Sequence, residues 1–279
     1  MFRPTQACRK SSLLQKSPSE EEPFLLPQIS SEWQENLVES GQSIMIISDL
    51  HYEQTYHHGV WEGEARDWLL GMVRSAKSAS LIALGDLGHA WRAVDWKCLT
   101  DLVPVHAIYG NHDNMEVLHS ARNNDGTRVL AEDGEVRVIG GLKVGFINGI
   151  MAKKGKTKVK DGVPRQSAEV FLSAVAKLVG VDVLATHASP YLPEYGSRYH
   201  ASDEFEVLDQ VLTQVNPPLS VSGHLSGPYT LAKLRDTTIL RIDSSPAERH
   251  YALMDFGTRQ IRIMHDHDQV EIGSFAEFS

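Results

Sequence analysis

The stretch "PVHAIYGNHD", residues 104–113, runs from apolar residues of strand type into a glycine, and then into an amide, an imidazole and a carboxylate. Gly, Asn and Asp are frequent in tight turns because they tolerate unusual backbone angles and hydrogen-bond their own main chain. Turn formation gives no reason for His112 at this position. The alternative is a functional site at the end of a strand, and the rest of the chain has to decide between the two.

Four other apolar segments end in polar residues in the same way: "SIMIISDLH" (43–51), "SLIALGDL" (80–87), "VDVLATHASP" (181–190) and "PLSVSGHLSG" (218–227). Segments of helical pattern lie among them, at about 62–77, 91–101, 166–179 and 203–214. Three alternating segments, "TTILRIDSS", "RHYALMDF" and "RQIRIMHDH", follow toward the C-terminus. This order predicts an α/β fold: a four-layer α-β-β-α sandwich of two packed mixed sheets flanked by helices.

The middle of the chain is less regular. We predict strands in "TRVLAE" (127–132), "EVRVIGG" (135–141) and "LKVGFING" (142–149), and a loop in the Gly- and Lys-rich stretch "AKKGKTKVKDGVPR" (152–165). Residues 1–42 mix Ser, Pro, Gln and charges without an apolar period, and are predicted to be a flexible N-terminal extension. A transit peptide is the alternative for this extension. Residues 43–279 are predicted to form one domain.

The composition narrows the function classes. A formal net charge of −9 over 279 residues argues against a broad electrostatic surface for nucleic acid. No apolar run approaches the ~20 residues needed to cross a bilayer, so no membrane association is expected. Cys8 and Cys98 are the only cysteines, which excludes a disulfide framework and a cysteine zinc site. The expected setting is reducing and cytoplasmic.

The polar residues at the five strand ends share one chemistry. In an open α/β sheet, loops at the carboxyl ends of strands converge on one crevice, so these residues should meet in space. All can donate oxygen or nitrogen to a divalent metal and none is a thiolate, which favours manganese, iron, zinc or similar ions. Their number exceeds what one tetrahedral ion takes, which indicates two ions sharing a bridging carboxylate. The set is Asp49, His51, Asp86, Asn111, His112, His187 and His224.

The order of these blocks resembles the calcineurin-like metallophosphoesterase superfamily. The matching blocks are "DLH" (49–51), "GDLG" (85–88), "GNHD" (110–113), "TH" (186–187) and "GHLS" (223–226), and the resemblance spans about 43–265. It implies metal-dependent hydrolysis of phosphomonoesters or phosphodiesters through in-line attack by a hydroxide that bridges two ions. The ions would be manganese, iron, zinc, nickel or cobalt, with manganese or an iron–zinc pair favoured.

The resemblance also assigns roles to residues. Asp49 and His51 would hold the first ion, and Asp86 would bridge the two ions. The second ion would be held by Asn111, His187 and His224. His112 would stay off the metals and face the scissile oxygen, as hydrogen-bond donor to the phosphoryl group or as general acid to the leaving alkoxide. Asp113 is grouped with His112 in the catalytic pair, most simply as the residue that holds the turn or orients its neighbours.

Three positions depart from the family pattern. Ser226 replaces the second histidine of the last block, so the first ion should be bound more weakly or with an extra water. Asp243, in "LRIDSS", is a candidate substitute near the metals, with a turn-capping aspartate as the alternative. The usual acidic partner of His112, three residues beyond the bridging aspartate, is replaced by His89.

The substrate is the least determined feature of the sequence. Arg198, Tyr199 and His200 follow the His187 block closely and are candidates to line the pocket. The lysines of 153–160 could guide a polyanion, although a solvated loop is favoured there. We expect a small or nucleotide-like phosphoester over duplex DNA. Two alternatives stay open: a nuclease acting on nucleic-acid ends, and a metal-binding interaction module with weakened or lost hydrolysis.

Overall fold

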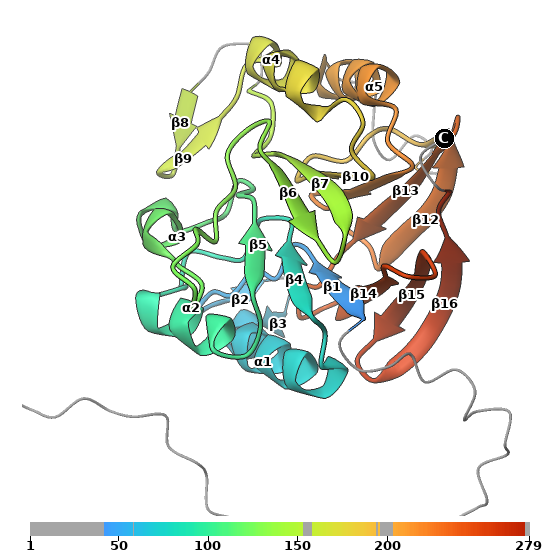
Figure 1. Cartoon of the computed structure of the whole chain (residues 1–279). Coiled ribbons are helices and arrows are strands. Elements are labelled where there is room, and N and C mark those ends of the chain that lie inside the picture. The colour runs from blue at the N-terminus through green and yellow to red at the C-terminus, as the bar shows by residue number, and fades with distance from the viewer. Residues whose placement is uncertain (1–41, 58, 153–157, 194, 196–202, 277–279) are drawn as a thin grey trace, which may run out of the picture. The chain divides into compact units, whose positions relative to one another are not determined.

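The computed structural model describes residues 42–57, 59–152, 158–193, 195 and 203–276. Residues 1–41 of the predicted extension therefore lie outside the described residues. Two six-stranded sheets form the centre of the fold (Figure 1). The first contains, in spatial order, β16 (Asp268–Ser274), β15 (Gln260–His265), β14 (His250–Asp255), β1 (Ser43–Ile47), β4 (Ser80–Ala83) and β5 (Val105–Ala107). The second contains β12 (Tyr229–Leu234), β13 (Thr237–Ile242), β11 (Leu219–Ser222), β10 (Val183–Thr186), β7 (Leu142–Ile147) and β6 (Val136–Ile139).

Both sheets are mixed, and their parallel strands carry the predicted site. In the first sheet β1, β4 and β5 are parallel, while β14 pairs with β1 in the antiparallel direction. In the second sheet β7, β10, β11 and β13 are parallel. Parallel neighbours have their carboxyl ends at one edge, so the segments after β1, β4, β5, β10 and β11 lie at the same end of the two sheets.

Helices cover the outer face of each sheet (Figure 1). The first sheet is covered by α1 (Ala65–Ala76), α2 (Ala93–Thr100) and α3 (Met115–Ser120), and the second by α4 (Ala168–Leu178) and α5 (Asp203–Val215). The alternation of β1 explains the layering. Met45 and Ile47 pack toward the helices of the first sheet, whereas Ile44 and Ile46 pack between the two sheets. Period-2 alternation thus divides one strand between two cores, and the predicted four-layer sandwich is confirmed.

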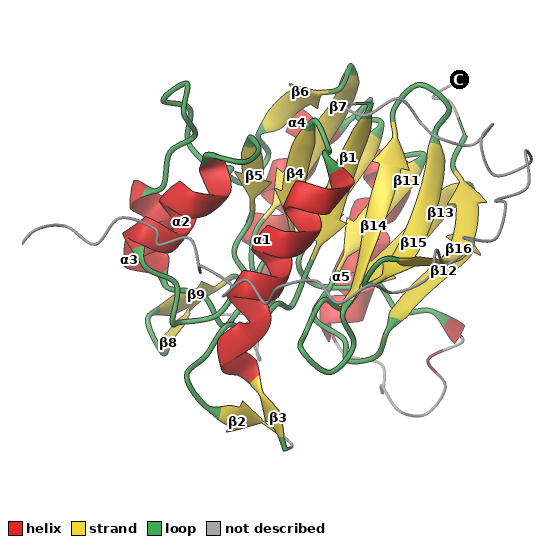
Figure 2. Cartoon of the chain, turned by 90° about the horizontal axis from the view of Figure 1, so that it is seen from below, coloured by secondary structure: helices red, strands yellow, loops and turns green. Residues whose placement is uncertain are grey.

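Two short hairpins extend from the sandwich at one end of the sheets (Figure 2). One pairs β2 (Tyr56–His57) with β3 (Val60–Trp61), and a 3-10 turn at Glu62–Glu64 leads from it into α1. The other pairs β8 (Lys158–Lys160) with β9 (Val163–Arg165). The prediction of a loop over 152–165 was therefore wrong for its second half. The predicted strand 127–132 was also wrong, since that segment makes only two isolated bridges, between Leu130 and Ala107 and between Arg128 and Arg122.

Candidate metal centre

The predicted ligands stand on unusual backbone at the ends of their strands. Asp49, His51, Asp86 and His224 all have left-handed backbone, with φ of 55°, 49°, 53° and 67°. Such a conformation costs a non-glycine residue roughly 1–3 kcal/mol and collects at functional sites. Asp and His tolerate it better than β-branched residues do. The backbone therefore turns sharply at these four residues.

Hydrogen bonds between the loops hold the strand ends together. Asp49 N–H donates to the carbonyl of Gly85 at 3.0 Å, and His51 N–H donates to the carbonyl of Asp86 at 2.9 Å. Across the second sheet, Gly223 N–H donates to the carbonyl of His187 at 3.0 Å. The loop after β1 is thus linked to the loop after β4, and the loop after β10 to the loop after β11, before any ligand binds, which limits the movement of the side chains on them.

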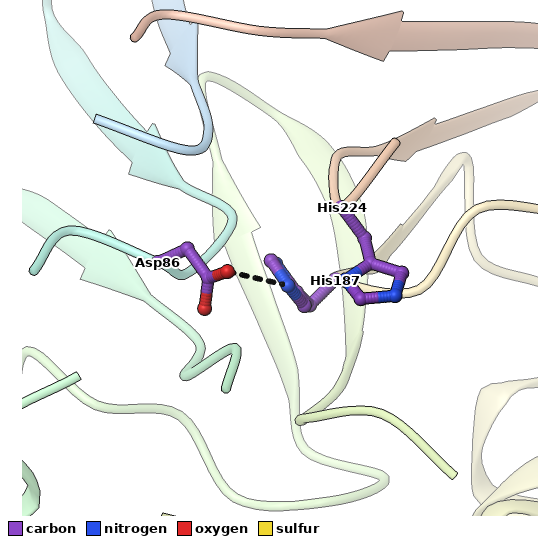
Figure 3. Close-up of side chains that lie close together, drawn as sticks. All are labelled: Asp86, His187 and His224. Atoms are coloured by element: carbon purple, nitrogen blue, oxygen red, sulfur yellow. Dashed lines mark ion pairs between the residues drawn. The ribbon is translucent and has the colours of Figure 1, made fainter. Parts of the chain in front are cut away.

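The side chains gather in two groups that share one residue. Asp86, His187 and His224 offer ligand atoms that all lie within 4.8 Å of one another, and so do Asp49, His51 and Asp86. Figure 3 shows the first group, whose members come from three separate strand ends. Asp86 is common to both groups, as the sequence predicted for a bridging carboxylate. This geometry suits two cations held on either side of one aspartate.

Two buried atoms show that the residues suit metal ions. His187 is fully buried, and its Nδ1–H donates to the carbonyl of Leu84 at 2.7 Å, so Nε2 is the atom that carries a lone pair once the ring is neutral. That Nε2 lies 3.4 Å from Asp86 Oδ2 and makes no hydrogen bond. Asn111 Oδ1 is likewise buried without a hydrogen-bond partner. A buried acceptor left unpaired is costly, and a divalent cation would satisfy both atoms.

Two glycines of the motifs are required by close packing against the carboxylates. A Cβ on Gly110 would collide with Asp86 Oδ1 and with the imidazole of His187. A Cβ on Gly223 would collide with Ser48 Oγ and with the carboxylate of Asp49. Both clashes fall on fixed, buried groups. The glycine before Asn111 and the glycine before His224 therefore allow the loops to approach the ligands closely.

Asp113 fixes the turn that carries Asn111 and His112. Its carboxylate accepts hydrogen bonds from the backbone N–H groups of Asp86 at 2.9 Å, Leu87 at 2.8 Å and Gly110 at 2.7 Å. Both carboxylate oxygens are used in this way, and Asp113 does not line the pocket described below. We therefore assign Asp113 a positioning role and remove it from the predicted catalytic pair.

Burial and mutual charge shift the ionisation of the ligands. Burial raises the pKa of Asp49 to about 7. Burial also disfavours the charged form of His187, but the attraction of the Asp86 carboxylate outweighs burial and raises the pKa of His187 to about 10. For Asp86 the positive charge of His187 outweighs burial and lowers the pKa. Burial, together with the charge of His187, lowers the pKa of His224 to about 3. The cluster thus retains protons that a bound cation would displace.

These shifts predict a pH-dependent metal affinity. A coordinating Asp49 must lose a proton held up to about pH 7, and a coordinating His187 must be neutral. Affinity should therefore rise with pH, with the Kd for manganese or zinc falling roughly tenfold per unit between about pH 5.5 and about pH 7. Calorimetric titration in two buffers of different ionisation enthalpy measures the protons released. A Kd that stays constant over this range would contradict the assignment.

A pocket of about 350 Å³ opens onto both ligand groups. His112 is exposed into it, and its ring centroid lies 5.4 Å from that of His51. The imidazole of His112 thus stands beside the metal ligands without belonging to either group. The pocket is lined by Asp49, His51, His57, Val60, Glu62, Asp86, Asn111, His112, His224, Ser226, Asp243, Ser245, Pro246, Ala247 and Glu248.

Ser226 and Asp243 both line this pocket but belong to neither ligand group among the described residues. The carboxylate of Asp243 accepts hydrogen bonds from the N–H groups of Gly227 at 3.1 Å and Ser245 at 2.9 Å. Asp243 therefore caps a turn, which is the alternative to a metal-site role that the sequence left open. The group of Asp49, His51 and Asp86 has three members, and Asn111 remains the predicted fourth ligand beside Asp86, His187 and His224. We expect the two ions to bind in two steps, the weaker one on the first group.

Glu53 is a site residue that the sequence interpretation missed. Its Oε1 accepts from the backbone N–H of His89 at 2.6 Å and lies 2.9 Å from His89 Nδ1. The His89 ring in turn packs edge-to-face against His112, with centroids 5.7 Å apart and an interplanar angle of 87°. The available signal was the position of Glu53, two residues after His51. A carboxylate thus supports His112 indirectly, through the histidine that replaces the usual acid.

This arrangement predicts that His89 positions His112. His89→Ala removes the ring that packs against His112, so kcat for a phosphoester should fall roughly 10- to 100-fold, as for other residues that orient a functional group. Glu53→Gln keeps an acceptor for His89 and should cost less. Metal content should match that of the unchanged protein in both variants. Steady-state kinetics with metal analysis tests this, and an unaltered kcat in His89→Ala would refute it.

The predicted substrate residues Arg198, Tyr199 and His200 lie outside the described residues, as do Lys153, Lys154 and Lys156. Lys158 and Lys160 are exposed on β8. Neither lines the pocket. The predicted substrate contacts therefore stay predictions.

The fold resembles those of several solved structures, including the following two. The protein TT1561 of Thermus thermophilus superposes with a TM-score of 0.61 at 14% identity, covering 81% of this chain and 100% of that chain. GAP50, the anchor in the inner membrane complex of Plasmodium, gives a TM-score of 0.54 at 10% identity, covering 85% of this chain and 89% of that chain. At these identities the likeness concerns the fold alone. No curated protein matches the sequence significantly.

Fold and site together define an α/β sandwich with a candidate His/Asp metal centre at the carboxyl ends of its strands. The chain belongs to the calcineurin-like phosphoesterase family, whose sequence profile matches residues 43–228. The resemblance inferred from the five sequence blocks is thus confirmed. Within the described part of the chain, no helix is long and apolar enough to cross a membrane.

Proposed function

We propose that this protein is a metal-dependent phosphoesterase with a binuclear centre. The observation that carries the proposal is the sharing of Asp86 between two groups of buried and partly buried oxygen and imidazole ligands. A single-ion site would need only one of these groups. The unpaired Oδ1 of Asn111 and Nε2 of His187 add independent support, because both are donor atoms of the kind that divalent cations take.

Asp49, His51 and Asp86 would hold one ion, and Asp86, Asn111, His187 and His224 would hold the other. When bound, such ions activate a water molecule as nucleophile and neutralise phosphoryl charge. The nature of the donors fits manganese, iron, zinc, nickel or cobalt, among which manganese or an iron–zinc pair is favoured. The cross-linked loops hold the ligands in place before substrate arrives, so little reorganisation accompanies the reaction.

His112 is the residue of the chain that would act on the substrate itself. Its ring is exposed in the pocket beside the ligands and packs edge-to-face against the ring of His89. In hydrolysis a water oxygen forms a new bond to phosphorus while the ester oxygen leaves. The departing oxygen needs a proton, and an imidazolium at His112 would donate it or would hydrogen-bond the phosphoryl oxygens.

The pocket favours a small phosphoester over nucleic acid. Among the described residues that line it there is no Lys or Arg, whereas Glu62, Asp243 and Glu248 stand on its wall. A nuclease would need a basic channel for the phosphate backbone. We therefore propose a small or nucleotide-like phosphomonoester or phosphodiester as substrate, and keep the nuclease as the less favoured candidate.

The test is hydrolysis of p-nitrophenyl phosphate and bis(p-nitrophenyl) phosphate by protein reconstituted with each of the five metals. Metal-dependent turnover supports the proposal, and the ratio of the two rates shows whether monoesters or diesters are preferred. Turnover confined to nucleic-acid ends, with steep salt dependence, would favour the nuclease. Two bound ions without turnover on any of these substrates would point to an interaction module instead.

A further inference from the structure

A second cavity of about 270 Å³ adjoins the metal pocket. Val60 and Pro246 line both cavities, so the two meet along these residues. We call this second cavity the annex. It is lined by Val60, Trp61, Glu64, Ala65, Trp68, Ser244, Pro246 and Arg249.

The annex is built from two indole rings and a guanidinium. Trp61 lies on β3, remains 36% exposed and packs against Tyr56, with ring centroids 5.0 Å apart. Trp68 is held in place, because its Nε1–H donates to Asp266 Oδ1 at 2.8 Å. Arg249 binds the same Asp266 oxygen at 2.9 Å. The annex thus offers a partly exposed aromatic surface, a fixed indole and charged groups at its edge, a combination that suits a planar ring with polar edges.

The metal pocket is lined by polar and acidic residues beside those that it shares with the annex. Ser245 directly precedes the shared Pro246, Glu248 follows it by two residues, and Glu62 lies 3.5 Å from His57. Carboxylates accept hydrogen bonds from hydroxyl groups but repel additional phosphates. A substrate that extends from the metal ligands to the annex therefore carries its negative charge at one end only, with an uncharged hydroxylated linker in the middle.

We propose that the metal pocket and the annex form one composite site for a nucleoside phosphate with a single phosphoryl group. The phosphoryl group lies at the metal ligands, the sugar lies beside Glu248 and Ser245, and the base packs against Trp61 and Trp68. This proposal rests on the proposed phosphoesterase function for its phosphoryl end. The annex itself does not depend on metal, so its binding of a base can be measured separately.

The first experiment measures binding without catalysis. Metal-free protein is titrated with adenosine, guanosine, cytidine and uridine, and tryptophan fluorescence is followed, with ribose as the control ligand. At least one nucleoside should quench the signal while ribose does not. Trp61→Ala should weaken that binding roughly 10-fold, since stacking on one aromatic ring is worth about that much, and Trp61→Phe should retain most of it. Val138→Ala, which removes an exposed apolar residue of β6 outside both cavities, should leave binding unchanged.

The second experiment measures discrimination. With metal restored, kcat/KM for nucleoside monophosphates is divided by kcat/KM for glycerol phosphate, which has a phosphoryl group and hydroxyls but no ring. The ratio should exceed one and should fall roughly 10-fold in Trp61→Ala. A nucleoside diphosphate should be a poorer substrate than the matching monophosphate.

The outcomes separate this inference from the proposed function. Nucleoside binding that depends on Trp61, without hydrolysis of any phosphoester, would refute the phosphoesterase and retain the annex as a base-binding site. Hydrolysis of glycerol phosphate and nucleoside monophosphates at equal rates, with no quenching by any nucleoside, would overturn the inference and leave the phosphoesterase standing. Octyl phosphate as the preferred substrate would also overturn it, because the annex would then bind an alkyl chain.

Discussion

Asp86→Asn is expected to abolish metal binding at the proposed binuclear centre and to lower kcat/KM by about three orders of magnitude. Asp86 is the one carboxylate in both ligand groups, so its replacement affects both ions together. Lewis-acid stabilisation by bound metal is worth several kcal/mol, and about 1.4 kcal/mol corresponds to each factor of ten in rate. Each other member of the two groups belongs to one group only, so no other single substitution among them is expected to affect both ions.

The isosteric change should leave the fold intact. Asp86 Oδ1 accepts from the backbone N–H groups of Asn111 and His112, and an amide oxygen can accept both of these hydrogen bonds. Metal content by elemental analysis and kinetics on a chromogenic ester provide the measurement. Asp268→Asn, at an exposed position of β16, is the matched control and should bind metal as before. Two ions retained in Asp86→Asn would refute the bridging assignment.

Asp243→Asn completes this comparison within the pocket. Asp243 lines the pocket but already accepts two backbone hydrogen bonds and lies in neither ligand group. Its substitution should therefore retain both ions. A loss of one ion would show that Asp243 substitutes for the missing histidine at Ser226, which was one of the two interpretations open from the sequence.

The strand ends were predictable because the residues there satisfy two patterns together. A buried strand needs a run of apolar residues, and the site needs polar residues directly after it, so "SIMIISDLH" and "SLIALGDL" mark both features within nine residues or fewer. The fully buried β1 and the buried end of β4 show the first pattern in the structure. The ligand groups on the following turns show the second.

Other features depend on tertiary contacts that leave no local pattern. The exposed hairpin β8–β9 includes three solvent-facing residues in β8, so it lacks the alternation that predicts a strand. The segment 127–132 has strand composition but pairs with β5 at one residue only. Glu53 and His89, 36 positions apart, are in contact through their side chains, and Trp61 and Arg249 line one cavity although they are far apart in the sequence. The spacing of residues along the sequence does not indicate such long-range contacts.

His112→Ala is expected to lower kcat by about two to four orders of magnitude while both ions stay bound. The range is that of a positioned proton donor or acceptor. Metal should be retained because His112 belongs to neither ligand group, and its backbone N–H will still donate to Asp86 Oδ1. His119→Ala, at an exposed position of α3 outside the pocket, is the matched control. Loss of metal in His112→Ala would show that the imidazole acts as a ligand instead.

Comparing esters with different leaving groups distinguishes the two possible roles of His112. A p-nitrophenolate leaves without a proton, whereas the alkoxide of a glycerol ester needs one. If His112 is the general acid, the variant should lose far more activity on the alkyl ester than on the p-nitrophenyl ester. If His112 hydrogen-bonds the phosphoryl oxygens, both esters should lose activity by similar factors, because the stabilised charge is the same in each. Unchanged rates on both esters would exclude His112 from the chemistry.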